Sequence, residues 1–336
     1  MKNNIKGKPF IFLLGLILLY QVKTFSQTTT IRGFVDIGAS LEDDKTSFEF
    51  GEYDLFITSE LSDHISFLGE TVFEYDDEEE QFEVGVERVI VNYNYKGNHS
   101  ILIGKHHTPI NYWNDSYHHG RVFFPTVSRP LLFAAHIIPL HTLGVALQGL
   151  NLGRLRFGYN VMVGNGLGSG EFKDNDKYKS LTAAFHIIPV DNMKIGISFY
   201  NDIISEGALL YGTLIDQKIN QHLYTASFAY FGSKFEMLVE GTSLNNNSDE
   251  SNTTAFAGYA YAGVRFYQKW VPYLRVDYLD FDEEKSYLPN NDMNSFIGGL
   301  RFEMNYLTVF KLEYQYADYD YLGTNNKLTF QVAIGF

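Results

Sequence analysis

Side chains alternate between apolar and polar along almost the whole chain, and this period of two limits the fold more than any other feature. Apolar or aromatic residues occupy alternate positions in residues 310–316 and 328–336, and all but one of the alternate positions in residues 53–61. A period of two is the pattern of a β-strand with two different faces. About sixteen such segments, 9 to 14 residues long, follow one another, and no run of 18 apolar residues occurs after residue 27. The pattern excludes a helical membrane protein and predicts an all-β protein.

The connections between these segments differ in length in a regular way. Tight turns at residues 96–98, 189–192 and 232–233 alternate with longer polar connections. Short turns at one end and long loops at the other are typical of outer-membrane β-barrels with an even number of strands. A soluble β-sandwich also alternates, but its strands have about 5 to 6 residues, whereas a strand that crosses a bilayer needs about 9 to 11.

We therefore expect a transmembrane antiparallel β-barrel of about 16 strands, a size that encloses an aqueous channel. The expected strands begin near residues 31, 48, 64, 82, 99, 141, 154, 178, 193, 220, 234, 254, 272, 295, 308 and 327.

Composition narrows the chemistry further. The chain has 24 Tyr and 28 Phe but 2 Trp, and aromatic residues favour strands. It contains no cysteine, which excludes disulfides, thiol nucleophiles and cysteine-bound metal centres. The formal charge of −14 argues against nucleic acid as a partner, because nucleic-acid binding needs a basic surface.

Residues 1–26 have the features of an export signal. Three lysines precede an apolar run at residues 10–20, which is too short to span a bilayer. We expect residues 1–26 to be a cleaved signal peptide and residues 27–336 to form the barrel. Cleavage removes four lysines and no acid from the 26 basic and 40 acidic residues, which leaves a formal charge of −18. The expected location is the outer membrane of a Gram-negative bacterium, in contact with outer-membrane lipid.

The longest connection, residues 108–140, is the most distinctive part of the sequence. It is the third long loop in the expected order, and a connection of this length is usually functional. We expect it to fold into the barrel and constrict the channel. Its sequence contains G-x-x-H-T-P at residues 104–109, Y-W-N at 112–114 and H-H-G at 118–120, ahead of an R-P pair at 129–130.

These blocks resemble those of an outer-membrane porin family akin to the phosphate-selective porins O and P. The resemblance covers about 35 residues in addition to the general barrel pattern. It implies a water-filled barrel for passive diffusion of small hydrophilic solutes or ions, without a cofactor. The expected lumen lacks the strongly basic lining that phosphate selectivity requires. A substrate-specific channel for an anion, a metal or a lipid-type molecule is a separate alternative. A monomer and a homotrimer both fit the sequence.

Charged side chains on the inward strand faces and in the long loop are the expected pore lining, because a charge on the lipid face costs a few kcal/mol near the midplane. An arginine wall facing an acidic wall would create a transverse field that sorts polar solutes, and a charge-neutralised lumen without selectivity is the alternative. The acidic candidates are Glu52, Asp54 and Glu70. The basic candidates on strands are Arg154, Arg156, Arg275 and Arg301. In and beside the loop, the candidates are Lys105, His107, His118, His119, Arg121 and Arg129.

Six of the ten histidines lie between residues 106 and 141. Imidazole groups bind zinc or copper, but adjacent side chains in an extended chain point to opposite sides. We therefore expect a packed loop rather than a metal site. If a metal binds, the expected ligands are His118, His119 and Asp115.

The chain stops on an aromatic residue inside a strand. Phe330, Val332, Ile334 and Phe336 occupy alternate positions. They resemble the C-terminal assembly signal of bacterial outer-membrane barrels, in which the barrel-assembly machinery reads a terminal Phe, and the resemblance implies that machinery as a partner. The alternative is an ordinary edge strand, which proteins usually protect with charge or proline.

A catalytic function has little support. Ser116, Tyr117 and His118 are close together, but the sequence has no G-x-S-x-G nucleophile elbow and nothing that fixes an oxyanion hole. We therefore expect a diffusion porin that is not an enzyme, and a barrel adhesin or outer-membrane enzyme is the remaining alternative.

Overall fold

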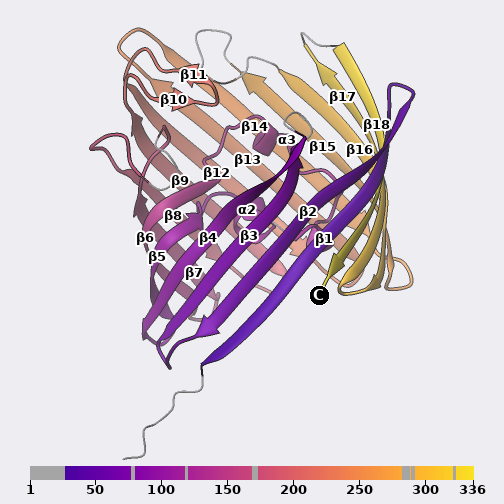
Figure 1. Cartoon of the computed structure of the whole chain (residues 1–336), viewed down its shortest axis with the longest axis horizontal. Coiled ribbons are helices and arrows are strands. Elements are labelled where there is room, and N and C mark those ends of the chain that lie inside the picture. Colours follow the sequence, from indigo (N-terminus) through magenta and orange to yellow (C-terminus); the bar gives the residue numbers. More distant parts are fainter. Residues whose placement is uncertain are drawn as a thin grey trace, which may run out of the picture.

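The computed structural model describes residues 27–76, 80–117, 120–168, 173–281, 288, 292–320 and 323–336. Within these residues the chain forms a closed antiparallel β-barrel of 16 strands (Figure 1). The first eight strands are β1 (Thr28–Glu42), β2 (Lys45–Glu60), β3 (Ile65–Asp76), β4 (Gln81–Lys96), β5 (His99–His107), β6 (His141–Leu152), β7 (Phe157–Gly164) and β8 (Ser180–Ile187). The others are β9 (Met193–Ile204), β12 (Ile219–Phe231), β13 (Phe235–Asn247), β14 (Asn252–Val264), β15 (Trp270–Phe281), β16 (Met293–Asn305), β17 (Thr308–Tyr319) and β18 (Gly323–Gly335).

Neighbouring strands in the chain are also neighbours in the barrel. A hairpin of β10 (Leu209–Leu210) and β11 (Thr213–Leu214) separates β9 from β12 in the chain, but these two strands still pair. The first and last strands close the barrel, since β1 pairs with β18. Next to this seam, Gly33 and Phe336 exchange two backbone hydrogen bonds of 2.9 Å. Closure leaves the barrel sheet without a free edge.

The alternation expected from the sequence gives the barrel two different surfaces. In β15 every second side chain from Val271 to Phe281 is buried, and the buried set includes Arg275. The intervening Leu274 and Val276 are exposed. The outward face of the strand is mainly apolar, as in barrels that contact lipid, whereas the inward face carries Arg275 and Asp277 together with apolar side chains.

The expected strand starts lie within four residues of the observed ones. The later start of β7, at Phe157, moves two of the expected pore-lining residues out of the strand. Arg154 and Arg156 precede β7 and lie in a turn, where Arg154 is exposed. Arg156 instead forms an ion pair of 2.8 Å with Asp191 in the next short turn. The expectation that both arginines line the lumen is wrong, because β7 begins only at Phe157.

The loop expected at residues 108–140 connects β5 and β6 with the predicted bounds. It carries α2 (Tyr112–Ser116), the 3₁₀-helix η1 (Arg121–Phe123) and α3 (Leu131–Ala134). Figure 1 shows α2 and α3 inside the outline of the barrel, and α3 contacts β14 and β15. The inward fold is confirmed, and we call residues 108–140 the inward loop.

In the described part of the chain, no helix combines the length and the apolar character needed to cross a membrane. The expected signal peptide, residues 1–26, lies outside the described residues.

An apolar cluster fixes the inward loop to one side of the barrel interior. Trp113 and Phe124 are fully buried, with ring centroids 5.3 Å apart, and Trp113 also meets Tyr259 of β14 at 6.1 Å. Burying a large apolar side chain stabilises a fold by about 1.5–3 kcal/mol. The loop is therefore packed like a protein core against this part of the wall. Other members from the loop are Leu131, Leu132, Phe133, Ile137 and Ile138, and those from the wall include Leu223, Leu238, Leu244, Ala257, Tyr261, Tyr273 and Ile297.

Candidate functional site

A buried carboxylate on the barrel wall holds the first turn of the inward loop. Glu240 of β13 accepts hydrogen bonds from the backbone N–H of Tyr112 and, at 3.0 Å, from that of Trp113. The hydroxyl of Tyr259 donates to the same carboxylate. N–H groups at the start of a helix have no partner inside it, so Glu240 satisfies two donors that would otherwise be buried unpaired.

A second carboxylate holds the later part of the loop. Glu313 of β17 accepts hydrogen bonds from the backbone N–H groups of Val127 at 2.8 Å and Ser128 at 3.0 Å. The hydroxyl of Tyr273 donates to it at 2.7 Å. Two acidic side chains on different strands thus bind the loop backbone at two places.

Arg275 and Arg301 lie beneath the inward loop instead of lining open space. They are only 1% and 5% exposed. Arg275 donates to the carbonyl of Ser128 at 2.7 Å, and Arg301 donates to that of Pro125 at 2.9 Å. Arg301 also donates to both carboxylate oxygens of Glu236, at 2.8 and 2.7 Å. The placement differs from the expected channel wall, because these guanidinium groups are used to bind loop carbonyls through charge-assisted hydrogen bonds.

Two arginines of the inward loop pair with acidic side chains of β1 and β2. Arg121 and Arg129 both donate to Oε1 of Glu52, at 2.8 and 2.7 Å, and Asp36 lies 3.5 Å from Arg121. Burial opposes the charge on Arg121, but the carboxylates of Glu52 and Asp36 outweigh it and raise the pKa of Arg121. Asp54, also expected here, is buried on the same strand. The structure therefore brings Arg121, Arg129 and Glu52 together as a paired cluster.

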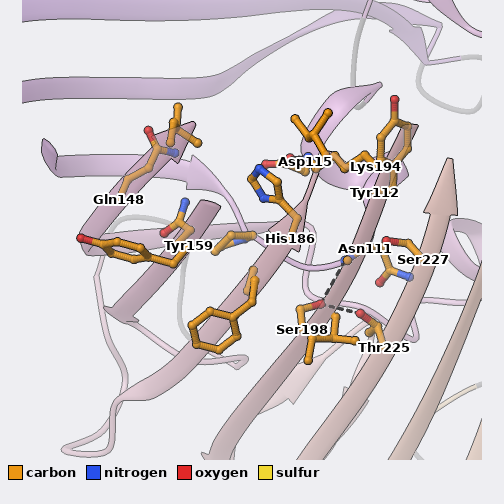
Figure 2. A pocket seen from close by; sticks show the side chains of 18 of the residues that line it. Asn111, Tyr112, Asp115, Gln148, Tyr159, His186, Lys194, Ser198, Thr225 and Ser227 are labelled. Carbon is orange, nitrogen blue, oxygen red and sulfur yellow. Dashed lines mark hydrogen bonds and ion pairs between the residues drawn. The ribbon is translucent and has the colours of Figure 1, made fainter. Parts of the chain in front are cut away.

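Open space lies between the inward loop and the part of the wall built from β2 to β9 and β12. Two cavities there, of about 370 and 400 Å³, share Asp115, Gln148 and Asn160 in their linings and so adjoin each other. Figure 2 shows polar side chains around the first cavity. Its polar lining is formed by Asn111, Tyr112, Asp115, Gln148, Asn151, Tyr159, Asn160, His186, Lys194, Ser198, Thr225 and Ser227.

An ion pair joins the loop to the wall in this cavity. Lys194 of β9 donates to Asp115 of the inward loop at 2.8 Å, and its Nζ lies 5.3 Å from the ring centroid of Tyr112. In Figure 2 the three side chains lie close together, Ser198 and Thr225 lie below them, and Gln148 and Tyr159 lie on the left. Apart from these two opposite charges, the polar lining of the cavity consists mainly of neutral hydrogen-bonding groups.

The remaining expected residues lie around the second cavity or near it. Glu70 pairs with Arg88, and its Oε2 is 3.6 Å from Nε2 of His107. Lys105 is buried and donates to the carbonyl of Val86 at 2.7 Å. These residues form a paired group at the root of the inward loop.

Two of the three metal ligands expected from the sequence are not among the described residues. His118 and His119 lie outside the described residues. Asp115, the third expected ligand, is paired with Lys194.

Sequence reasoning missed the neutral residues that the two cavities share. Gln148 and Asn160 carry no charge, and the search for lumen residues followed charge. Both nevertheless stand within period-two segments, on β6 and β7. An inventory of every polar residue on the inward face would have included them.

Comparison of the fold with solved structures finds several outer-membrane barrels. An anion-selective porin from Comamonas acidovorans has a TM-score of 0.68 and 9% identity, with 92% of this chain and 100% of the other covered. OmpT, an outer membrane protein of Vibrio cholerae in its trimer form, has a TM-score of 0.66 and 13% identity, with 92% and 99% covered. The outer membrane channel DcaP of Acinetobacter baumannii has a TM-score of 0.65 and 11% identity, with 92% and 97% covered. This chain is therefore similar to porins in fold.

The sequence alone finds no such relatives. It matches no protein-family model, and no curated protein matches it. The resemblance to phosphate-selective porins O and P accordingly stays an expectation.

Proposed function

We propose that this protein is an outer-membrane porin. Small hydrophilic solutes or ions would diffuse through the passage between the inward loop and the wall formed by β2 to β9 and β12. The observation that carries the proposal is the pair of adjoining polar cavities beside a loop docked inside a 16-strand barrel. Barrels of this size enclose an aqueous channel. The proposed passage involves no chemical step, so the protein would not be an enzyme.

The charges along the passage favour general diffusion over phosphate selectivity. Asp115 offsets Lys194, and Glu70 offsets Arg88. A channel that selects strongly for phosphate needs unbalanced positive charge on its wall. We therefore propose a weakly selective porin, without the phosphate selectivity of the porins O and P.

The proposed location is the bacterial outer membrane, and the proposed assembly is a homotrimer. An apolar outer surface supports contact with lipid. The trimer form of the similar OmpT barrel supports a trimer here. Light scattering of the detergent-solubilised protein measures the number of copies, and a monomeric mass would contradict the trimer without affecting the channel.

Single-channel recording in planar lipid bilayers tests the proposed function. The protein should give stepwise ohmic currents. Replacing Asn160 by Trp should lower the unitary conductance, because the larger side chain fills space shared by both cavities. The matched control is Val276→Trp, which adds a similar volume on the outward face and should leave the conductance unchanged. Absence of any current from correctly folded protein would overturn the proposal and favour an adhesin or an enzyme.

A further inference from the structure

The inward loop begins and ends at a pair of histidines. His107 is the last residue of β5 and pairs directly with His141, the first residue of β6. Their ring centroids are 5.4 Å apart. Glu87 of β4 lies beside them, with its Oε2 2.6 Å from Nε2 of His141. In the described ranges, these three residues are the group of histidine and acidic side chains whose ligand atoms all lie within 4.8 Å of one another.

Two imidazoles and one carboxylate form a chemically specific ligand set. Zinc binds this combination in sites that leave a further coordination position open. Imidazole also suits copper and nickel, whereas calcium and magnesium prefer oxygen ligands throughout. A tetrahedral ion with bonds of about 2.1 Å separates its ligand atoms by roughly 3.4 Å. Side-chain rotations that move the ligand atoms by about an ångström would therefore bring them from their present spacing to that of a coordination shell.

The surroundings favour a cation that arrives from water. A second carboxylate, Glu70, lies 3.6 Å from His107, so the site has two nearby acids. The neighbouring positive groups are already engaged, since Arg88 pairs with Glu70 and Lys105 donates to a backbone carbonyl. His107 borders the second cavity, and His141 borders another cavity of about 330 Å³. Both sides of the site are therefore in contact with space that water can fill.

We propose that Glu87, His107 and His141 bind a divalent transition-metal ion with the coordination chemistry of zinc. The three ligands come from three adjacent strands, and two of them are the ends of the inward loop. A bound ion ties both roots of the loop to β4. This site is separate from the weak candidate set of His118, His119 and Asp115, and it does not depend on the proposed diffusion of solutes.

Calorimetric titration of the full, tag-free chain in detergent with zinc chloride tests the proposal. We expect one zinc ion per chain and no comparable heat with calcium chloride. Double replacement His107→Gln and His141→Gln should weaken binding by tenfold or more, since even groups that only orient a ligand contribute on the order of 10- to 100-fold. Glu87→Gln, which preserves the shape of the side chain, should also weaken zinc binding. It tests the site even if the double variant does not fold.

The matched control replaces His118 and His119 by Gln and should keep zinc affinity. A circular-dichroism spectrum and a thermal midpoint like those of the parent show that each variant is folded. The visible spectrum of bound cobalt adds a second readout, because tetrahedral imidazole coordination gives intense bands that should disappear in the His107 and His141 variant. The absence of zinc binding, or its loss in the control instead of in the His107 and His141 variant, would overturn the assignment.

Discussion

Lys194 of β9 donates a hydrogen bond of 2.8 Å to Asp115 of the inward loop, and this ion pair links the two sides of the proposed passage. Its two charges cancel each other where both adjoin the first cavity. The loop therefore approaches the wall here through polar groups, whereas on the other side it is joined to the wall by a packed apolar cluster. The barrel interior is therefore filled on the side of the apolar cluster and open on the side of Lys194 and Asp115.

Neutralising Lys194 and neutralising Asp115 should shift the ion selectivity of the channel in opposite directions. Lys194→Gln leaves Asp115 unbalanced and should raise the cation preference, and Asp115→Asn should raise the anion preference. An unpaired charge 4 Å from an ion contributes about 1 kcal/mol in water, which corresponds to roughly a fivefold change in local ion concentration. Reversal potentials in a salt gradient measure the shift. Equal reversal potentials for the two variants and the parent would mean that ions do not pass close to Lys194 and Asp115.

The carboxylate of Glu240 should stabilise the docked inward loop. Glu240→Gln keeps the shape of the side chain but loses charge-assisted acceptance from the N–H groups of Tyr112 and Trp113. A buried donor left unsatisfied costs about 1–3 kcal/mol, so the thermal midpoint in detergent should fall. Current noise should rise, because the start of the loop is less firmly held. Glu206→Gln, an exposed position outside the barrel strands, is the control and should match the parent.

Arg275 and Arg156 offer a comparison between a buried and an exposed guanidinium. Arg275→Met removes hydrogen bonds to Thr126 and Ser128 and leaves Asp277 without its partner at 3.1 Å. Breaking a buried ion pair costs about 3–5 kcal/mol, whereas an exposed pair contributes about 0–1 kcal/mol. Arg156→Met, which breaks the pair with Asp191, should therefore change the thermal midpoint far less. Equal losses in the two variants would contradict the role assigned to Arg275.

Acid should weaken the contact between the inward loop and the β10–β11 hairpin. His136 stacks on Tyr211 with ring centroids 4.0 Å apart, and burial lowers the pKa of His136 from its usual 6.5. The unfolded chain therefore takes up this proton first, and folding stability falls as the pH drops below about 6.5. His136→Gln should reduce the difference in thermal midpoint between pH 7 and pH 5. A variant with the full acid sensitivity of the parent would show that His136 does not contribute.

The barrel was predictable because its signals are local. Alternation along each segment decides which side chains share a face, and turns set where the segments end. The bounds of the inward loop, between His107 and His141, followed from the same pattern. The error at Arg154 and Arg156 has a local cause as well, since positive φ angles at Asn151, Gly153 and Arg156 extend the turn and delay β7.

The roles of the lumen residues were not predictable to the same degree. Alternation places Arg275 and Arg301 on the inward face, but it does not say what covers that face. The loop groups they bind are more than 140 residues away in the chain, at Ser128 and Pro125. Only the tertiary fold shows that charges expected to face water instead hold the loop, and that Gln148 and Asn160 line the open side.

Replacement of Phe336 should separate folding from assembly in the cell. Phe336 lies at the closing seam, bonded to Gly33 through the backbone and stacked on Tyr53 at 6.1 Å. Phe336→Ala leaves the backbone bonds intact, so refolding in detergent should yield a barrel with the parent's circular dichroism. If the terminal Phe is read by the assembly machinery, the amount of folded barrel in bacterial outer membranes should fall severalfold. Leu312→Ala, a loss of apolar volume on the outward face of β17, is the control. Equal amounts of folded barrel for the two variants would mean that Phe336 contributes only to packing and is not read as an assembly signal.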